Sequence, residues 1–297
     1  MSGVRLRAFC KINLCLEVLG RRPDGYHELA TVFQALSLAD DVRVRTRDER
    51  GITLDVDGDG VPPGRANLAW QAAKAYRQER NWPEGVSLGL VKRIPVGAGL
   101  GGGSTDAAAV LNGLAELDPD PLGVLELRAL AADLGADVPF FITGGAAIGY
   151  GRGDEVNGLI GGILGWVVLA RPRDLQIPTS EAYSMLSADD FTDGSRAAEM
   201  ATTLEHFAGL AAVADLVYTA FSRPLIERWP VLGELREGLR ELGALAAEIT
   251  GSGSAVFGLF ERESLAEQAA QSLAAAGHWT RVTEPVEIGA EIIERTE

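Results

Sequence analysis

The sequence predicts an α+β protein in two parts. Short runs of alternating apolar and polar residues fill the first 95 positions, and a glycine-rich loop leading into a helix follows them. After about residue 195 the chain is dominated by Ala/Leu/Glu-rich stretches that are typical of helices. The composition changes within residues 158–165, so we predict one domain over residues 1–158 and a second over residues 159–297.

Composition and charge exclude several classes of protein. The chain has 297 residues, of which 46% are hydrophobic and 23% charged, as in ordinary globular domains. A net charge of −15 makes nucleic acid and anionic membranes poor partners. The longest apolar run, over residues 158–170, is shorter than the roughly 20 residues of a spanning helix, and residues 1–14 contain no apolar core of a signal peptide. We expect a cytoplasmic monomer or weak homodimer.

The first half contains strands separated by turns. Residues 11–18 alternate strictly, which puts Lys11 and Asn13 on one face of a strand, and residues 23–25 form a turn. Residues 42–47 and 52–56 read as half-exposed antiparallel strands, residues 67–80 as an Ala-rich helix and residues 86–90 as another strand.

The remaining elements follow from the same periodicities. Around the middle of the chain we expect helices over residues 104–117 and 124–134, a strand over 140–142 and a Gly-rich hairpin over 144–153. Beyond the boundary we expect strands over residues 166–170, 255–260 and 279–288, and helices over residues 196–222, 231–245 and 264–276.

The chain has two cysteines, Cys10 and Cys15. They lie five residues apart on one predicted strand, where alternation directs them to opposite faces. A metal site would need more ligands than these two. We therefore expect two free thiols in a reducing compartment.

Residues 95–106 read Pro-Val-Gly-Ala-Gly-Leu-Gly-Gly-Gly-Ser-Thr-Asp and lead into a helix. Glycines allow positive φ angles and bring bare backbone N–H groups close to a ligand, and a helix N-terminus adds unpaired donors and a positive dipole end. The loop is therefore predicted to hold an anion, most naturally a polyphosphate. Ser104 or Thr105 would cap the helix, or help to place Mg²⁺ and a phosphate.

Two other glycine-loop families fit less well. A Walker A loop needs a lysine before the serine, where this chain has Gly103. A dinucleotide fingerprint matches Gly97, Gly99 and Gly102, but it needs an acidic residue after the next strand. The candidates here lie in the Asp-Pro-Asp-Pro stretch at residues 118–121, with no strand before them, so a dehydrogenase is the weaker alternative.

Together with four other phrases, in order along the chain, this loop resembles the GHMP kinases. These phrases are Lys-Ile-Asn at residues 11–13, Pro-Asp-Gly-Tyr-His at 23–27, Gly-Ala-Asp-Val-Pro-Phe-Phe at 135–141 and Thr-Gly-Ser-Gly-Ser at 250–254. The resemblance implies an N-terminal domain like ribosomal protein S5 and a ferredoxin-like C-terminal domain. It implies that ATP, with Mg²⁺, is held by Pro95, Val96, Gly97, Ala98, Gly99, Leu100, Gly101, Gly102, Gly103, Ser104 and Thr105, and it assigns no side chain as a metal ligand.

The resemblance also implies the catalytic residues. Lys11 would favour the alkoxide that forms on the substrate, although by itself it reads as a solvated strand lysine. Asp137 would be the general base, whereas its sequence context alone fits a turn or cap residue equally well. Asp106, in a first helical turn, reads as compensation of the helix dipole.

The resemblance also implies the substrate and the residues that bind it. Relatives with this set of phrases phosphorylate the 2-hydroxyl of 4-diphosphocytidyl-2-C-methyl-D-erythritol, in the non-mevalonate isoprenoid pathway. By resemblance, the substrate-binding residues are Asn13, Tyr26, His27, Tyr183, Gly251 and Ser252. His27 would hydrogen-bond the cytosine and Tyr183 would stack on it. From the residues alone, Asn13 also suits a sheet edge, Tyr26 and His27 suit a strand, and Tyr183 suits helix packing.

One departure and two alternatives remain open. Relatives carry an acidic Asn-Asp-(Phe or Leu)-Glu motif where this chain has Thr-Ala-Phe-Ser at residues 219–222, which puts a role for that motif in doubt here. A different GHMP small-molecule kinase is one alternative. A non-catalytic nucleotide-binding protein on the same fold is the other, but the presence of both Lys11 and Asp137 favours an enzyme.

Overall fold

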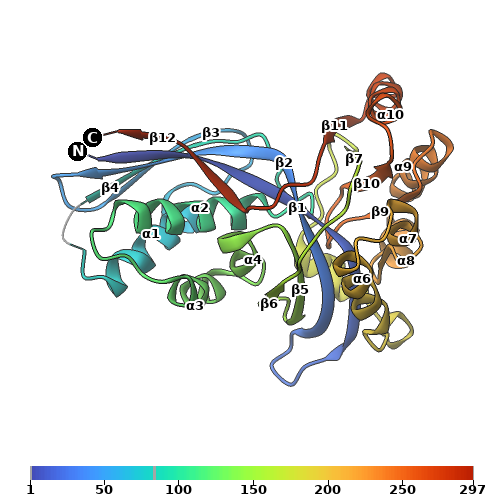
Figure 1. Cartoon of the computed structure of the whole chain (residues 1–297), viewed down its shortest axis with the longest axis horizontal. Helices are drawn as coiled ribbons and strands as arrows, with labels where there is room; N and C mark the ends of the chain where they lie inside the picture. The colour runs from blue at the N-terminus through green and yellow to red at the C-terminus, as the bar shows by residue number, and fades with distance from the viewer. Residues whose placement is uncertain (1, 83–84, 297) are drawn as a thin grey trace.

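The computed structural model describes residues 2–82 and 85–296 and contains two sheets (Figure 1). The larger sheet has the strand order β12-β1-β2-β4-β3, with β5 and β6 added through β2 and β8 added beside β1. The smaller sheet has the order β11-β7-β10-β9. The predicted α+β class is confirmed.

Each strand of the larger sheet has defined bounds: β1 Gly3–Arg21, β2 His27–Arg47, β3 Ile52–Asp57, β4 Gly85–Val91, β5 Ala146–Gly151, β6 Glu155–Gly158, β8 Tyr218–Thr219 and β12 Ala290–Thr296. The strands of the smaller sheet are β7 Trp166–Arg171, β9 Ala246–Ile249, β10 Val256–Phe260 and β11 Trp279–Thr283.

Four helices lie on one side of the larger sheet: α1 Leu68–Glu79, α2 Gly102–Leu117, α3 Val124–Leu134 and α4 Val138–Thr143 (Figure 1). Helix α3 packs against the other three helices. The central helix, α2, is buried along most of its length because its Ala-rich surface lets it approach the sheet closely. At Gly113 a β-carbon would lie only 3.0 Å from Val44 and 3.1 Å from Leu6. This close packing fixes where the N-terminus of α2 lies relative to β1 and β2.

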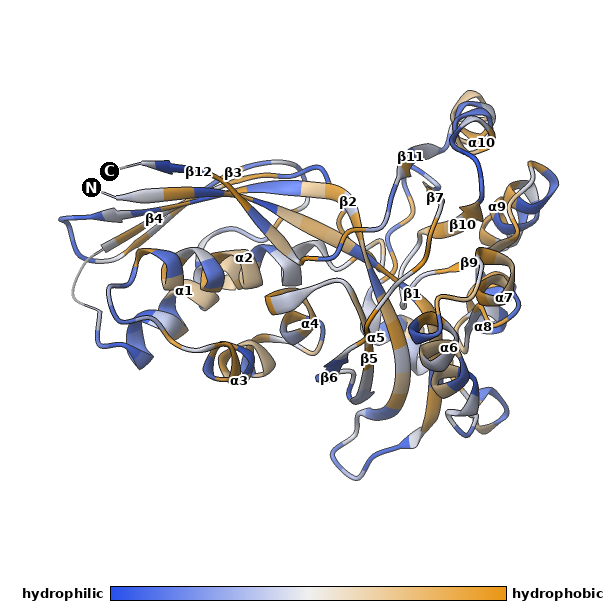
Figure 2. Cartoon of the chain, viewed as in Figure 1, coloured by the Kyte–Doolittle hydropathy of each residue, from blue (hydrophilic) through white to orange (hydrophobic). Residues whose placement is uncertain are grey.

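The second half of the chain supplies six helices in the described residues: α5 Thr179–Ser184, α6 Ser195–Glu205, α7 Leu210–Ala214, α8 Ser222–Arg228, α9 Pro230–Glu241 and α10 Glu263–Ala275. Helices α9 and α10 pack against the smaller sheet, while α6 packs against β1, β2 and β5. Figure 2 shows apolar stretches along β1, β9 and β10, where these layers meet.

The alternation predicted for β1 is interrupted by a bulge. The pairing of β1 with β2 shifts register between Asn13 and Cys15, so one extra residue changes which face the later side chains occupy. As a result Cys10 and Cys15, expected on opposite faces, are buried in the same apolar cluster. Both thiols are free, as predicted, and burial raises the pKa of each well above its usual value.

Two predictions about the first half are wrong. Residues 140–142 belong to helix α4 rather than to a strand, because a short, fully buried apolar run has no periodicity that separates the two, and Pro139 occupies the first turn of the helix. Strand β3 pairs with β4 in parallel, not antiparallel. Helix α1 lies between them in sequence, and a crossover of that length allows parallel pairing.

In the second half, the expected helix over residues 196–222 is broken. It is divided into α6, α7 and the short strand β8, with Phe207 in a left-handed conformation at φ 51° after the end of α6. The helix expected over 231–245 ends at Glu241, and β9 follows it. The strand expected over 279–288 ends at Thr283.

Strand β12 joins the end of the chain to its beginning. It pairs antiparallel with β1, so that Gly3 lies opposite Thr296 and the two termini lie together (Figure 1). The chain therefore returns to the sheet of the first half after building the second sheet. The domain division between residues 158 and 159 stays a prediction. The structure shows in addition that β12, which follows this division in sequence, pairs with a strand of the first half.

Candidate active site

A cavity of about 940 Å³ opens beside the N-terminus of α2. Its walls come from β1, the β1–β2 turn, the glycine loop, the α3–α4 turn, the β5–β6 turn, α5 and the turn after β9. Of the predicted site residues, the cavity is lined by Lys11, Asn13, Tyr26, His27, Pro95, Val96, Gly97, Ala98, Gly99, Leu100, Gly101, Gly102, Gly103, Ser104, Asp137, Tyr183, Gly251 and Ser252. Thr105 is fully buried behind this wall and stays only a prediction.

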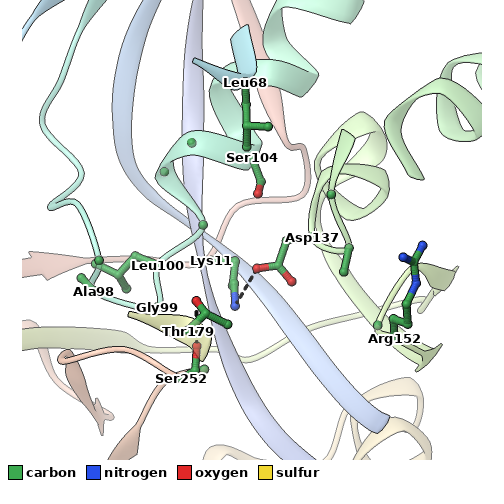
Figure 3. Close-up of a pocket in the computed structure, with 18 of the residues that line it drawn as sticks. Lys11, Leu68, Ala98, Gly99, Leu100, Ser104, Asp137, Arg152, Thr179 and Ser252 are labelled. Atoms are coloured by element: carbon green, nitrogen blue, oxygen red, sulfur yellow. Dashed lines mark hydrogen bonds and ion pairs between the residues drawn. The ribbon is translucent and has the colours of Figure 1, made fainter. Parts of the chain in front are cut away.

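Lys11 and Asp137 form an ion pair inside this cavity (Figure 3). The Nζ atom of Lys11 lies 3.3 Å from Oδ2 of Asp137, and Lys11 is only 3% exposed. Asp137 stands at the N-cap of α4, yet among the described residues its side chain makes no capping hydrogen bond. Asp137 thus occupies the cap position, but its carboxylate pairs with the lysine at the cavity instead of capping the helix.

Asn13 connects this ion pair to the sheet. Its Oδ1 accepts a hydrogen bond of 2.7 Å from Lys11 Nζ, and its Nδ2 donates one of 2.8 Å to Thr31 Oγ1. Thr31 in turn donates to the backbone oxygen of Cys15. Both polar ends of the buried amide are thus bonded, which fixes its orientation and directs the lysine.

Aromatic side chains form an apolar floor below the lysine. Lys11 Nζ lies 5.5 Å from the centre of the Phe33 ring, and Phe33 stacks on Phe140 at 4.9 Å between ring centres. This surface excludes water from one side of the ammonium, so its interaction with Asp137 is less screened than at a surface.

The glycine loop takes a shape that side chains would prevent. Gly99 and Gly101 have φ angles of 79° and 75°. A β-carbon on Gly101 would lie 2.5 Å from the Phe141 ring. Helix α2 begins directly after Gly101, two residues earlier than predicted, so neither Ser104 nor Thr105 is the cap. Ser104 lines the cavity in the first turn, where N–H groups lack intrahelical partners.

The second glycine turn, at residues 250–254, packs directly against this loop. A β-carbon on Gly99 would lie 2.1 Å from the carbonyl oxygen of Thr250, and one on Gly253 would lie 2.1 Å from the backbone of Ala98. Ala255 N donates to Ala98 O at 3.1 Å. These contacts hold the glycine loop between the smaller sheet and β1.

Aromatic residues gather at the other end of the cavity. The rings of His27 and Tyr183 lie 5.1 Å apart, and Tyr183 packs edge-on against Phe221. Burial, and then the nearby Arg21 charge, lower the pKa of His27, so its imidazole is neutral at pH 7. Tyr26 is 58% exposed at the rim, with the Arg152 guanidinium 5.4 Å from its ring centre.

Sequence reasoning missed three features of the site. Arg171 is buried and donates to the carbonyl oxygens of Val96 and Leu175, which ties the smaller sheet to the glycine loop. Arg152 contributes a cation at the rim. Lys92 is buried beside Asp106. Lysine is rare in this arginine-rich chain, and that rarity is the signal by which the sequence could have indicated Lys92.

Within residues 2–82 and 85–296, no group of three or more His, Cys, Asp or Glu side chains is placed to hold a metal ion. In the stretch that replaces the acidic motif, Thr219, Ala220 and Ser222 line a separate cavity of about 470 Å³, where Ser222 Oγ donates to Glu248. They do not line the larger cavity.

Two family profiles match the chain. The GHMP kinases N terminal domain matches residues 67–145 and the GHMP kinases C terminal matches residues 218–278. The first match contains the glycine loop and Asp137, and the second contains the 250–254 turn. The protein called 4-diphosphocytidyl-2-C-methyl-D-erythritol kinase in Geobacter metallireducens is 37% identical over 94% of this chain and 97% of its own length.

The chain belongs to the GHMP kinase family. The protein of the same name in Gloeobacter violaceus is 40% identical, over 92% of this chain and 91% of its own length. Both similarities thus extend over nearly the full length of the proteins compared.

Solved structures agree with this assignment. The crystal structure of 4-(cytidine 5'-diphospho)-2C-methyl-D-erythritol kinase superposes with a TM-score of 0.78 at 37% identity, covering 94% of this chain and 98% of that one. Homoserine kinase from Cytophaga hutchinsonii superposes with a TM-score of 0.79 at 17% identity, covering 98% and 97%, which shows the shared fold. The two-domain GHMP kinase fold is confirmed. In the described part of the chain, no helix has the length and apolarity to cross a membrane.

Proposed function

We propose that the protein transfers the γ-phosphoryl group of ATP to the 2-hydroxyl of 4-diphosphocytidyl-2-C-methyl-D-erythritol. The observation that carries the proposal is the Lys11–Asp137 pair, at 3.3 Å, in one cavity with the glycine loop. The names and full-length similarity of the relatives support the choice of acceptor.

The cavity fits a nucleotide triphosphate at its glycine end. The start of α2 presents backbone N–H groups and the positive end of a helix dipole, which favour phosphate oxygens. Bound with the nucleotide, Mg²⁺ would neutralise polyphosphate charge. Ser104 is the polar side chain of the first turn that lines the cavity beside this position.

The aromatic end fits the cytidine of the acceptor. Tyr26, His27 and Tyr183 offer two flat faces and one neutral imidazole, which suit a base that stacks and forms hydrogen bonds. The Lys11–Asp137 pair lines the same cavity as the aromatic residues and the glycine loop, and we infer that the acceptor hydroxyl meets the γ-phosphate beside this pair.

The chemistry follows from the two charged side chains. Asp137 accepts the proton of the acceptor hydroxyl as that oxygen forms its bond to the γ-phosphorus, and the bond from this phosphorus to the β,γ-bridging oxygen breaks to release ADP. Lys11 stabilises the negative charge that develops on the attacking oxygen. Phosphoryl transfer has a loose transition state in most analyses, so positioning and electrostatics contribute more than base strength.

The experiment measures ADP release from Mg·ATP with a panel of acceptors. We expect turnover with the cytidyl substrate, and little with mevalonate, galactose or homoserine. Turnover with one of those three and none with the cytidyl substrate would assign the protein to another GHMP activity. No turnover with any acceptor, with ATP still raising the melting temperature, would support the non-catalytic alternative. Stabilisation by NAD instead of ATP would support the dehydrogenase alternative.

A further inference from the structure

Three charged side chains meet beneath the glycine loop, away from the Lys11–Asp137 pair. Lys92 follows the end of β4, Asp40 lies on β2 and Asp106 lies on α2. The Nζ atom of Lys92 contacts Asp40 and lies 2.5 Å from Oδ2 of Asp106. The side chains of the lysine and the two aspartates are 6%, 0% and 3% exposed.

Two of these three residues, Lys92 and Asp40, bond to the two ends of the loop. Lys92 Nζ donates to the carbonyl oxygen of Gly102, the first residue of α2, at 3.3 Å. Asp40 Oδ1 accepts from the backbone N–H groups of Arg93 and Ile94, at 2.5 and 2.8 Å, where the chain enters the loop. The triad thus connects two strands, the loop entrance and the helix that ends the loop.

We propose that Asp40, Lys92 and Asp106 are positioning residues that hold the glycine loop in the form that binds the polyphosphate. This inference rests on the proposed function, because it assigns the loop to ATP. Lys92 is not a substitute for the lysine of a Walker A loop, since its ammonium is engaged by two carboxylates and a carbonyl oxygen.

The charges of the triad do not balance unless one carboxyl carries a proton. Burial lowers the pKa of Lys92, but Asp106 and Asp40 together raise it above its usual value, so the ammonium stays charged. Burial raises the pKa of Asp106 to about 7, with Asp40 adding to the rise and Lys92 opposing it. Asp106 Oδ1 is buried with no hydrogen-bond partner in the described residues, an arrangement that disfavours full ionisation.

The triad therefore changes charge near neutral pH. With Asp106 protonated, one ammonium faces one carboxylate and the net charge is zero. With Asp106 ionised, a net negative charge is buried in the wall of a cavity that receives a polyphosphate, and the two repel each other with little screening. Affinity for ATP should fall as the pH rises through about 7, because the ionised form becomes the majority.

The first test compares Lys92→Met with Lys74→Met, since Lys74 is an exposed lysine on α1. Loss of the charge-assisted bonds should raise the KM for ATP about tenfold or more in Lys92→Met. The kcat and the KM for the acceptor should stay within about threefold of wild type, because the Lys11–Asp137 pair is untouched. Lys74→Met should match wild type in every constant.

The second test uses Asp106→Asn, which keeps the shape of a protonated aspartate and should disturb folding less than Lys92→Met does. The KM for ATP of wild type should rise between pH 6.5 and 8.5 more steeply than that of Asp106→Asn, and the two should agree at the lower pH. Because ATP also titrates in this range, the difference between the two proteins is the readout, not either profile alone.

Outcomes separate the two proposals. Two results would overturn the triad proposal while wild type still turns over ATP, which leaves the proposed function standing. One is an unchanged KM for ATP in Lys92→Met, and the other is an Asp106→Asn profile against pH that matches wild type. Absence of nucleotide binding or turnover in wild type would overturn both. A folded Lys92→Met variant whose kcat falls while its KM values for ATP and for the acceptor both rise would show a general structural role. That result would also contradict the proposal.

Discussion

Lys11 shows how the neighbours of a single residue determine the role that we propose for it. A buried ammonium is costly unless it is paired, and here it has a carboxylate at 3.3 Å, an amide oxygen at 2.7 Å and an aromatic ring below it. None of these partners is adjacent in sequence to the lysine. The side chain of Asp137 is 35% exposed and lines the cavity, so a substrate can reach its carboxylate.

Replacing Asp137 by Asn should remove the base without removing the fold. We expect kcat to fall by about 10²- to 10⁴-fold. The increase in melting temperature caused by ATP should remain close to that of wild type, because the loop is unchanged. Steady-state kinetics and thermal unfolding check this, with Asp55→Asn on exposed strand β3 as the control. Loss of nucleotide binding in Asp137→Asn would show that the aspartate supports the loop instead.

Asp41 carries a pH-dependent part of the stability. Its buried side chain accepts hydrogen bonds from Arg5 Nε and Nη2, which lower the pKa of its carboxyl. A lowered pKa contributes stability that is fully present above the unfolded value of about 4 and is lost as the pH falls through the lower folded value. Asp41→Asn should therefore destabilise the protein at pH 7 by about 1 kcal/mol.

Urea unfolding at pH 7 and at pH 3 measures this contribution. The difference between wild type and Asp41→Asn should shrink at the lower pH, where the wild-type carboxyl begins to lose its charge. A difference that is constant over this range would mean that packing of the Asp41 side chain, and not its ionisation, supplies the stability.

At the scale of an element, the junction between the glycine loop and α2 decides the shape of the proposed phosphate site. Gly101 is the N-cap of α2 in a left-handed conformation, and the helix continues through Gly102 and Gly103. The three glycines are therefore not equivalent. The first is required by backbone geometry and by the Phe141 ring, whereas the last lies in regular helix with space around it.

The pair Gly101→Ala and Gly103→Ala tests this difference. A β-carbon at Gly101 would lie 2.5 Å from Phe141 Cζ on a backbone at φ 75°, so this variant should lose about 1–2 kcal/mol or more and bind ATP less well. At Gly103 the nearest atom would be Leu68 Cδ1 at 3.7 Å, and alanine should raise the unfolding free energy by up to about 1 kcal/mol. Urea unfolding measures both, and equal losses in the two variants would contradict the argument.

At the scale of the whole molecule, β12 closes the larger sheet. It covers the edge of β1, the strand that carries Lys11 and Asn13, and it comes from the last residues of the chain. Because β1 also pairs with β2 along its other edge, its position is fixed from both sides. The site therefore depends on a segment that follows the entire second sheet in sequence.

Removing residues 290–297 should expose the edge of β1 and destabilise the fold. We expect the melting temperature to fall by roughly 2–4 °C for each kcal/mol lost, and the shortened chain to associate through its open strand edge. Differential scanning calorimetry and light scattering check this. Glu294→Gln is the control, since it removes one surface charge that faces Arg5 at 3.8 Å and leaves the strand in place. A truncated chain as stable as wild type would contradict this role for β12.

The sequence alone determined the class of the fold and most of the elements, and every predicted site residue except Thr105 lines the cavity. These features are local: turn glycines, helix-ending residues and alternating apolar positions act within a few residues of themselves, and the motif phrases are contiguous. The catalytic residues were predicted through such phrases, and the structure places Lys11 and Asp137 together in the cavity.

Only the tertiary structure decided the rest. Residues 140–142 became helix because burial from every side removes the periodicity that separates a helix from a strand. Strand β3 became parallel to β4 because helix α1 connects them, and a bulge in β1 put both cysteines into one cluster. The return of β12 to β1 and the meeting of Asp40, Lys92 and Asp106 join segments far apart in the chain. Such contacts depend on how complete layers pack against each other, and no short stretch of sequence carries that information.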